Sequence, residues 1–196
     1  MVHYDPLQLP HAELKRRVVP MVAGMDATER PGRTWRLPVC YHDSCGPDLA
    51  DVAVRTGLSV AQVVERHSAA TYHVYMVGFL PGYPYMGGLP PELELPRREN
   101  PRIKVPSGSV AIAMAMTAIY TLESPGGWHL LGRTPAPIWD VRRTPPALLT
   151  AGDQLLTIVN PEQREVLAVL RATMLKAEAF HGVRGDAAQL VRMLLA

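Results

Sequence analysis

Along the middle of the chain, apolar and polar positions alternate with a period of two, which predicts short β-strands. The run Val-Ala-Ile-Ala-Met-Ala-Met at residues 110–116 alternates large and small side chains. This pattern indicates a strand that is buried on both faces, with its alanines against something close-packed. Further strands are expected at residues 35–41, 71–79, 119–122, 128–133, 136–139 and 154–159. Many short strands at this spacing predict a mainly β fold, either a barrel or a sandwich.

Two helices are expected between the first two of these strands. Pro47 suits the first turn of a helix because its missing N–H is not needed there, and Gly57 is a typical stop. Ser59 and Gln62 form a capping-box pattern that opens the second helix, which runs towards His67.

Both ends of the chain have helical patterns. Residues 1–30 contain a short predicted strand and a predicted helix at residues 11–22. One strand and one helix cannot bury both of their faces, so this segment is interpreted as the end of a larger unit or a cap on the main domain. Residues 161–196 are interpreted as a helical tail, which leaves residues 31–160 as the main domain.

Composition narrows the classes of function. The 196 residues are 47% hydrophobic with a net charge of +2, which predicts a folded protein and gives no electrostatic footprint for nucleic acid. Residues 110–122 form the longest apolar run, shorter than the ~20 residues of a membrane span. With no visible signal peptide, a cytoplasmic protein is expected.

Cys40, His42 and Cys45 could form a metal cluster, but free thiols without a metal are the simpler interpretation.

Residues 81–106 form a long stretch rich in proline and glycine, which is expected to lack regular strand pairing. A long loop inside a compact domain is usually functional. Arg97, Arg98, Arg102 and Lys104 lie in it and could bind a carboxylate or a phosphoryl group, although solvated surface cations are equally common.

Several motifs occur in a fixed order and together are specific. They are residues 67–72, 78–89 (Gly-Phe-Leu-Pro-Gly-Tyr-Pro-Tyr-Met-Gly-Gly-Leu), 96–102, 105–110 and 123–135 (Glu-Ser-Pro-Gly-Gly-Trp-His-Leu-Leu-Gly-Arg-Thr-Pro). In this order they resemble the allophanate hydrolase subunit 1 family, which includes the B subunit of 5-oxoprolinase and is also called carboxyltransferase subdomain C/D. The resemblance covers residues 35–159.

The resemblance implies a cyclophilin-like β-barrel preceded by a small α/β domain, of which residues 1–30 would be a truncated remnant. It also implies a hetero-oligomer with a partner of the C/2 subunit family. Proteins of this kind fall into three functional classes: ATP-dependent opening of 5-oxoproline, the carboxyltransferase part of urea carboxylase or allophanate hydrolase, and non-catalytic inhibition of a histidine kinase by Kip-type proteins. The first class makes the chain a subunit of a hydrolase with ATP as its cofactor.

Candidate site residues follow from the motifs. His67 is assigned to catalysis, for proton handling or orientation, and the alternative is a histidine that only caps a helix end. The predicted substrate- or nucleotide-binding residues are Phe79, Pro81, Gly82, Tyr85, Arg97, Arg102, Met116, Gly126, Gly127 and Trp128. The glycines could let backbone amides approach an anion, but no Walker lysine follows, so ATP would be held in another way. His129 is interpreted as an ordinary exposed residue.

Residues 111–121 depart from the family pattern. Ala111, Met114 and Ala118 stand where glycines are usual, Met116 replaces a glutamine and Thr121 a proline. A thioether cannot reproduce the donors and acceptor of an amide. The resemblance as a whole makes a subunit of an ATP-dependent 5-oxoprolinase the leading hypothesis. These departures favour the alternative, a non-catalytic binding protein or an inactive copy.

Overall fold

The alternating segments of the sequence form one seven-stranded sheet in the computed structural model, which describes residues 3–23 and 32–159. The strands follow the order β1 (Thr34–Val39), β9 (Gln154–Val159), β2 (Thr71–Val77), β3 (Pro84–Gly87), β6 (Met116–Ile119), β5 (Ser109–Ala113) and β8 (His129–Arg133). Two backbone hydrogen bonds of 2.8 and 2.9 Å join Cys40, just after β1, to Arg133 in β8. The sheet thereby nearly closes on itself, and the prediction of a mainly β, barrel-like fold is confirmed.

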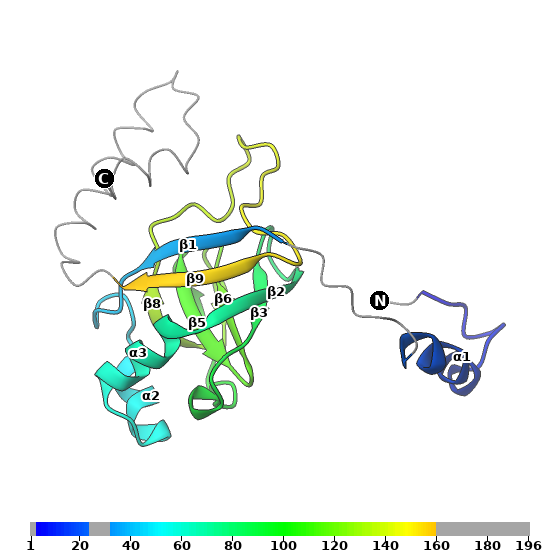
Figure 1. The fold of residues 1–196 in the computed structure, drawn as a ribbon, viewed down its shortest axis with the longest axis horizontal. Coiled ribbons are helices and arrows are strands. Elements are labelled where there is room, and N and C mark those ends of the chain that lie inside the picture. The colour runs from blue at the N-terminus through cyan, green and yellow to red at the C-terminus, as the bar shows by residue number, and fades with distance from the viewer. Residues whose placement is uncertain (1–2, 24–31, 160–196) are drawn as a thin grey trace. The chain divides into compact units, whose positions relative to one another are not determined.

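Most neighbouring strands are antiparallel, but β1 and β9 run parallel, with Thr34 opposite Gln154. Figure 1 shows these two strands, blue and gold, side by side. A separate two-stranded ribbon joins β4 (Arg102–Val105) to β7 (Ser124–Gly126).

Helices α2 (Leu49–Thr56) and α3 (Val60–Ala69) occupy the positions expected from the sequence. Gly57 ends α2 with a left-handed backbone. Ser59 and Gln62 make both hydrogen bonds of the capping box at the start of α3. The two helices lie together at one end of the barrel (Figure 1).

The main hydrophobic core fills the barrel interior, because every strand of the sheet contributes a side chain to it. The contributors from the sheet include Leu37, Leu155, Val74, Met86, Ile119, Ile112 and Leu131, and those from the helices include Leu49, Val52 and Val63. Helices α2 and α3 therefore cover one end of the interior. A short 3-10 helix, η1 (Pro91–Leu93), adds the buried Leu93.

Several strand predictions were wrong. Of the predicted strand at residues 119–122, only Ile119 lies in a strand, as the last residue of β6. Residues 136–139 form only an isolated bridge from Trp139 to Ala147, and Pro135 and Pro137 lack the N–H groups that a ladder needs. Conversely, both β3 and β4 lie inside the stretch 81–106, which was expected to lack regular pairing. Pro84 is the first residue of β3, where the missing donor is tolerated.

Residues 1–31 form a compact unit of their own, separate from residues 32–196. It contains α1 (His11–Ala23), which includes Pro20 and has no buried residue. The described residues 3–10 contain no strand, since a lone strand has no partner for its backbone groups in this unit. The predicted helical tail lies outside the described residues. No helix in the described ranges has the length and hydropathy of a membrane span.

Candidate functional site

The outer face of the sheet carries a second hydrophobic cluster. Alternation along β5 sends Val110 and Ile112 to the interior and places Ala111 and Ala113 on this outer face, and all four side chains are buried. Ala118 of β6 joins the two alanines. The prediction of a strand buried on both faces is confirmed for residues 110–113. It is wrong for residues 114–116, because Met114 and Ala115 are exposed in a turn and Met116 begins β6. Small side chains here leave room over the sheet for a layer of large rings.

Five aromatic residues form that layer: Phe79, Tyr83, Tyr85, Tyr120 and Trp128, together called the aromatic layer. Tyr83 is its centre, with ring centroids 5.4 Å from Phe79, 5.0 Å from Tyr85, 5.2 Å from Tyr120 and 6.4 Å from Trp128. All four pairs are edge-to-face, the arrangement that the quadrupoles of aromatic rings favour. Phe79 is 64% exposed and Tyr85 half-buried, so these two present the layer to solvent.

Phe79 adopts a backbone φ of 69°, in the left-handed region that bulky residues rarely occupy. Such a conformation costs of order 1–3 kcal/mol, and these outliers cluster at functional sites. It follows β2, in the turn that also contains the exposed Pro81 and the buried Gly82. Of the predicted residues in this turn, Phe79 contacts the aromatic layer through Tyr83, whereas Gly82 faces Trp139 and Ala147.

Arg97 is the exposed cation beside the aromatic layer. Burial raises the pKa of the Tyr83 and Tyr120 phenols, and the positive charge of Arg97 acts on both in the opposite direction. Both phenols stay neutral at physiological pH. Within the described part of the chain, the Arg97 side chain forms no hydrogen bond or ion pair. Its five N–H groups are therefore available to donate hydrogen bonds to an anionic ligand.

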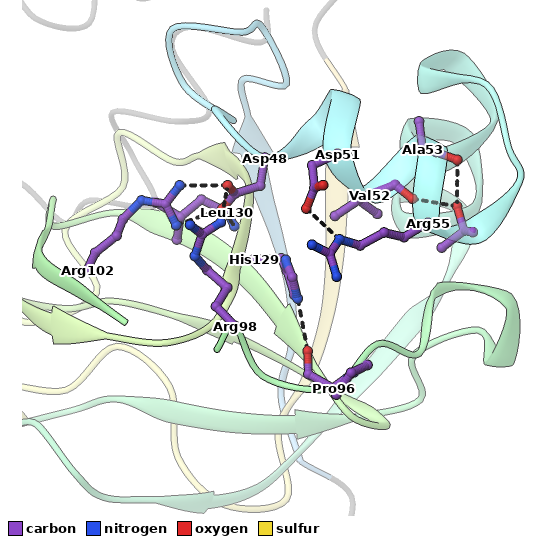
Figure 2. Close-up of polar contacts among 11 residues, drawn as sticks. Asp48, Asp51, Val52, Ala53, Arg55, Pro96, Arg98, Arg102, His129 and Leu130 are labelled. Atoms are coloured by element: carbon purple, nitrogen blue, oxygen red, sulfur yellow. Dashed lines mark hydrogen bonds and ion pairs between the residues drawn. The ribbon is translucent and has the colours of Figure 1, made fainter. Parts of the chain in front are cut away.

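Arg102, which the sequence predicts to bind substrate or nucleotide, is bound by the chain's own Asp48. Its two terminal nitrogens donate to the Asp48 carboxylate over 2.8 and 2.6 Å, and Arg98 donates over 2.8 Å (Figure 2). The N–H of Leu130 adds a fourth hydrogen bond of 2.7 Å. The Asp48 side chain is only 4% exposed. Arg102 is therefore engaged by an internal partner, and its role in binding substrate or nucleotide stays a prediction.

His67 lies in the barrel interior and is completely buried. Its Nδ1 lies 2.7 Å from the Tyr41 hydroxyl, and its Nε2 lies 3.1 Å from the Thr117 hydroxyl. Burial lowers the pKa of the imidazole from 6.5 to about 3, so it stays neutral. The imidazole therefore does not face solvent in this structure. Its assignment to proton handling or orientation stays a prediction.

Met116 is half-buried and packs against the cluster that contains the aromatic layer. Its neighbour two residues earlier, Met114, lies in the two-residue turn between β5 and β6 with a φ of 53°. A glycine at that position would adopt this conformation without strain, which gives the departure from the family pattern a physical cost.

Gly126 and Gly127 have different roles. A Cβ on Gly126 would collide with the Tyr120 hydroxyl, so the absence of a side chain lets the ring lie against the β7 backbone. A Cβ on Gly127 would meet Pro101 at 3.6 Å and the Arg98 carbonyl oxygen at 3.9 Å, both ordinary contacts. Gly126 is thus required for packing, and the Gly127 carbonyl accepts a hydrogen bond of 2.8 Å from the Arg98 N–H.

Sequence reasoning missed two residues of this region. His129 was expected to be exposed but is 1% exposed, and its Nε2 donates to the Pro96 carbonyl over 2.9 Å. Asp48, the residue before α2, makes no cap with its side chain and binds two arginines instead. No local signal marks either contact, because each joins residues more than 30 positions apart. In the described ranges, no group of three metal-ligating side chains occurs.

Comparison with known proteins gives the family. Residues 1–149 match the family described as carboxyltransferase domain, subdomain C and D. The chain belongs to this family. It is 43% identical over 156 residues to the B subunit of 5-oxoprolinase from Escherichia coli O157:H7, a match that covers 73% of this chain and 72% of that protein. The Bacillus subtilis protein of the same name is 41% identical over 145 residues, covering 74% of this chain and 60% of that protein.

Solved structures agree with this assignment. A conserved uncharacterized protein from Pyrococcus horikoshii is 40% identical with a TM-score of 0.64, over 82% of this chain and 74% of that one. A longer solved chain is also 40% identical with a TM-score of 0.63, and this chain spans 30% of its length. The urea carboxylase of Kluyveromyces lactis is 18% identical with a TM-score of 0.64 over 95% of this chain, which shows a shared fold for the subdomain C and D family.

Proposed function

We propose that this chain is the B subunit of an ATP-dependent 5-oxoprolinase and that it binds 5-oxoproline at the aromatic layer. The relatives that are named as B subunits of 5-oxoprolinase support the reaction. The observation that carries the site is Arg97, an exposed guanidinium beside a layer of neutral aromatic rings.

The chemistry of 5-oxoproline matches this surface. Its carboxylate pairs with the fork of Arg97, which binds carboxylates in bidentate geometry. The CH₂ groups of its five-membered ring pack against the exposed Phe79 and the half-buried Tyr85. Met116 borders the same surface with a side chain that adapts its shape but offers no amide.

The proposed reaction converts 5-oxoproline, ATP and water into glutamate, ADP and phosphate. The reaction consumes two waters: one replaces the ring C–N bond, so that its oxygen ends on the former carbonyl carbon and the nitrogen becomes the amino group of glutamate. The other balances cleavage of the bond between the β- and γ-phosphates of ATP, which releases ADP and phosphate. The designation of the relatives as one subunit implies further subunits. We propose a protein of the C/2 subunit family as the partner that completes the ATP-dependent step.

The test is turnover by the complex reconstituted with its partner subunits, measured as glutamate release from 5-oxoproline and ATP. Arg97→Ala is expected to raise KM for 5-oxoproline roughly tenfold to hundredfold, because a hydrogen bond to a charged group contributes about 1.5–3 kcal/mol. Arg36→Ala is the matched control, an exposed arginine in β1, and should leave KM unchanged. An intact complex that releases no glutamate, or an unchanged KM in Arg97→Ala, would count against the proposal.

A non-catalytic binding protein is the second candidate, and Met116 in place of the family glutamine favours it. The triple variant Met114→Gly, Met116→Gln and Ala118→Gly discriminates between the two. A gain in turnover identifies a weakened active site of the same enzyme. If the wild type has no turnover and the folded triple variant has none either, a role in binding alone is supported.

A further inference from the structure

The peptide segment around Arg97 is fixed on both sides by contacts that do not involve the Arg97 side chain. The Pro96 carbonyl accepts a 2.9 Å hydrogen bond from His129 Nε2 (Figure 2). Because a carbonyl oxygen can only accept, the proton of His129 lies on Nε2. On the other side, the Arg98 N–H donates to the Gly127 carbonyl over 2.8 Å. Arg97 lies between these two anchors, and its side chain is exposed to solvent.

Asp48 is the buried group on which one of these anchors depends. Its carboxylate joins four parts of the fold: the start of α2, the loop at Arg98, strand β4 at Arg102, and strand β8 at Leu130 (Figure 2). A buried carboxylate is tolerated only when it is paired and hydrogen-bonded, and this one accepts hydrogen bonds from four N–H groups. One carboxylate against two guanidiniums also leaves an excess positive charge in the cluster.

We propose that Asp48 is a positioning residue for Arg97. It binds Arg98, holds the loop on β7 and β8, and thereby fixes the Arg97 guanidinium beside the aromatic layer. Asp48 itself does not contact the substrate, since its own oxygens are occupied and its side chain is 4% exposed. This inference rests on the proposed function, in which Arg97 binds the carboxylate of 5-oxoproline.

Removal of the Asp48 charge should weaken substrate binding through Arg97 and should leave the chemical step unchanged. In Asp48→Asn, two guanidiniums lose their counter-charge and repel each other, so the loop is no longer held. A mobile Arg97 weakens ground state and transition state alike, which raises KM and leaves kcat unchanged. We expect KM for 5-oxoproline to rise about tenfold in the reconstituted complex, the effect of one hydrogen bond to a charged group.

The matched control is Asp51→Asn, which removes a carboxylate from the same helix. Asp51 pairs with Arg55 over 2.7 Å, and both side chains are about half exposed (Figure 2). Its KM should equal that of the wild type. A double-mutant cycle then tests whether Asp48 acts on KM through Arg97. In an Arg97→Ala background, Asp48→Asn should cause no further rise in KM. Additive effects of the two variants would overturn the proposal.

A second measurement does not depend on turnover. Hydrogen exchange of the Arg98 amide, followed by NMR on the full chain, reports whether the loop is held. Asp48→Asn should accelerate this exchange at least tenfold and Asp51→Asn should not. Unchanged exchange in Asp48→Asn overturns the positioning role. Faster exchange together with an unchanged KM in Arg97→Ala means that Asp48 holds the loop but the assigned carboxylate site is wrong.

Asp48→Asn could fail to fold because the carboxylate is buried. Arg98→Ala then provides the same test with a smaller perturbation, since Arg102 and the Leu130 N–H still satisfy Asp48. It should reproduce both the tenfold rise in KM and the faster exchange of the residue 98 amide. A folded Arg98→Ala protein with wild-type values of both would overturn the proposal.

Discussion

The buried imidazole of His67 makes the stability of the barrel depend on pH in a calculable way. The side chain is completely buried between Tyr41 and Thr117, with hydrogen bonds to both hydroxyls. Among the described residues no carboxylate holds a proton on it, and burial lowers its pKa from 6.5 to about 3. The perturbation is acidification from pH 7.5 to pH 5, compared between the wild type and His67→Gln.

The sign follows from proton binding in the two states. Below pH 6.5 the unfolded chain protonates this histidine, whereas the folded protein does so only near pH 3. The contribution of His67 to stability is therefore complete above pH 6.5 and is lost as the pH falls. The slope is about 1.4 kcal/mol per pH unit, so acidification from pH 6.5 to pH 5 costs about 2 kcal/mol.

Urea denaturation, followed by tryptophan fluorescence at both pH values, measures this cost. A glutamine at position 67 can still donate one hydrogen bond and accept another, but it does not titrate. The loss of unfolding free energy on acidification should be about 2 kcal/mol smaller in His67→Gln than in the wild type. Equal losses in the two proteins would show that His67 is not the neutral buried group described here.

Two further predictions concern the backbone near the site. Met114→Gly should raise the unfolding free energy by about 0.5–1 kcal/mol, because relief of a left-handed φ outweighs the extra chain entropy of glycine. Urea denaturation measures this gain, and a loss of stability would contradict it. Gly126→Ala should lower the melting temperature through a clash with Tyr120 that costs about 1–3 kcal/mol. Gly127→Ala makes ordinary contacts of 3.6 Å or more and should change stability by less than about 0.5 kcal/mol. Equal effects of the two variants would refute this packing argument.

Local patterns in the sequence predict much of this fold. The period-two run predicts β5 and its burial on both faces over residues 110–113, because alternation is a property of a single strand. The same run hides the turn at Met114 and Ala115, since their apolar side chains continue the alternation. The Ser59 capping box and Gly57 predict the junction of the two helices, since each acts within one turn. Strand β3 escaped prediction because its pairing with β2 and β6 comes from distant segments, which local proline content does not reveal.

The candidate site likewise has residues that local sequence patterns identify and contacts that only the fold shows. The density of prolines, glycines and cations in one loop identifies Arg97 as a candidate, and the structure leaves that side chain open. The same reasoning could not separate Arg97 from Arg102, because only the fold shows that Asp48, 54 residues earlier, takes the second guanidinium. His67 illustrates the converse case: a histidine near a helix end gives no sign of which way its ring points.

The parallel pairing of β1 with β9 has a consequence for synthesis of the chain. Thr34 and Gln154 pair across 120 residues, and the other neighbour of this segment, β8, is also made late. At ribosomal rates of about 5–20 residues per second, β1 waits roughly 6–24 s for its partner strand. During that time its backbone groups form an open edge that other chains can pair with. A nascent or truncated chain that ends before residue 154 is therefore expected to aggregate through β1.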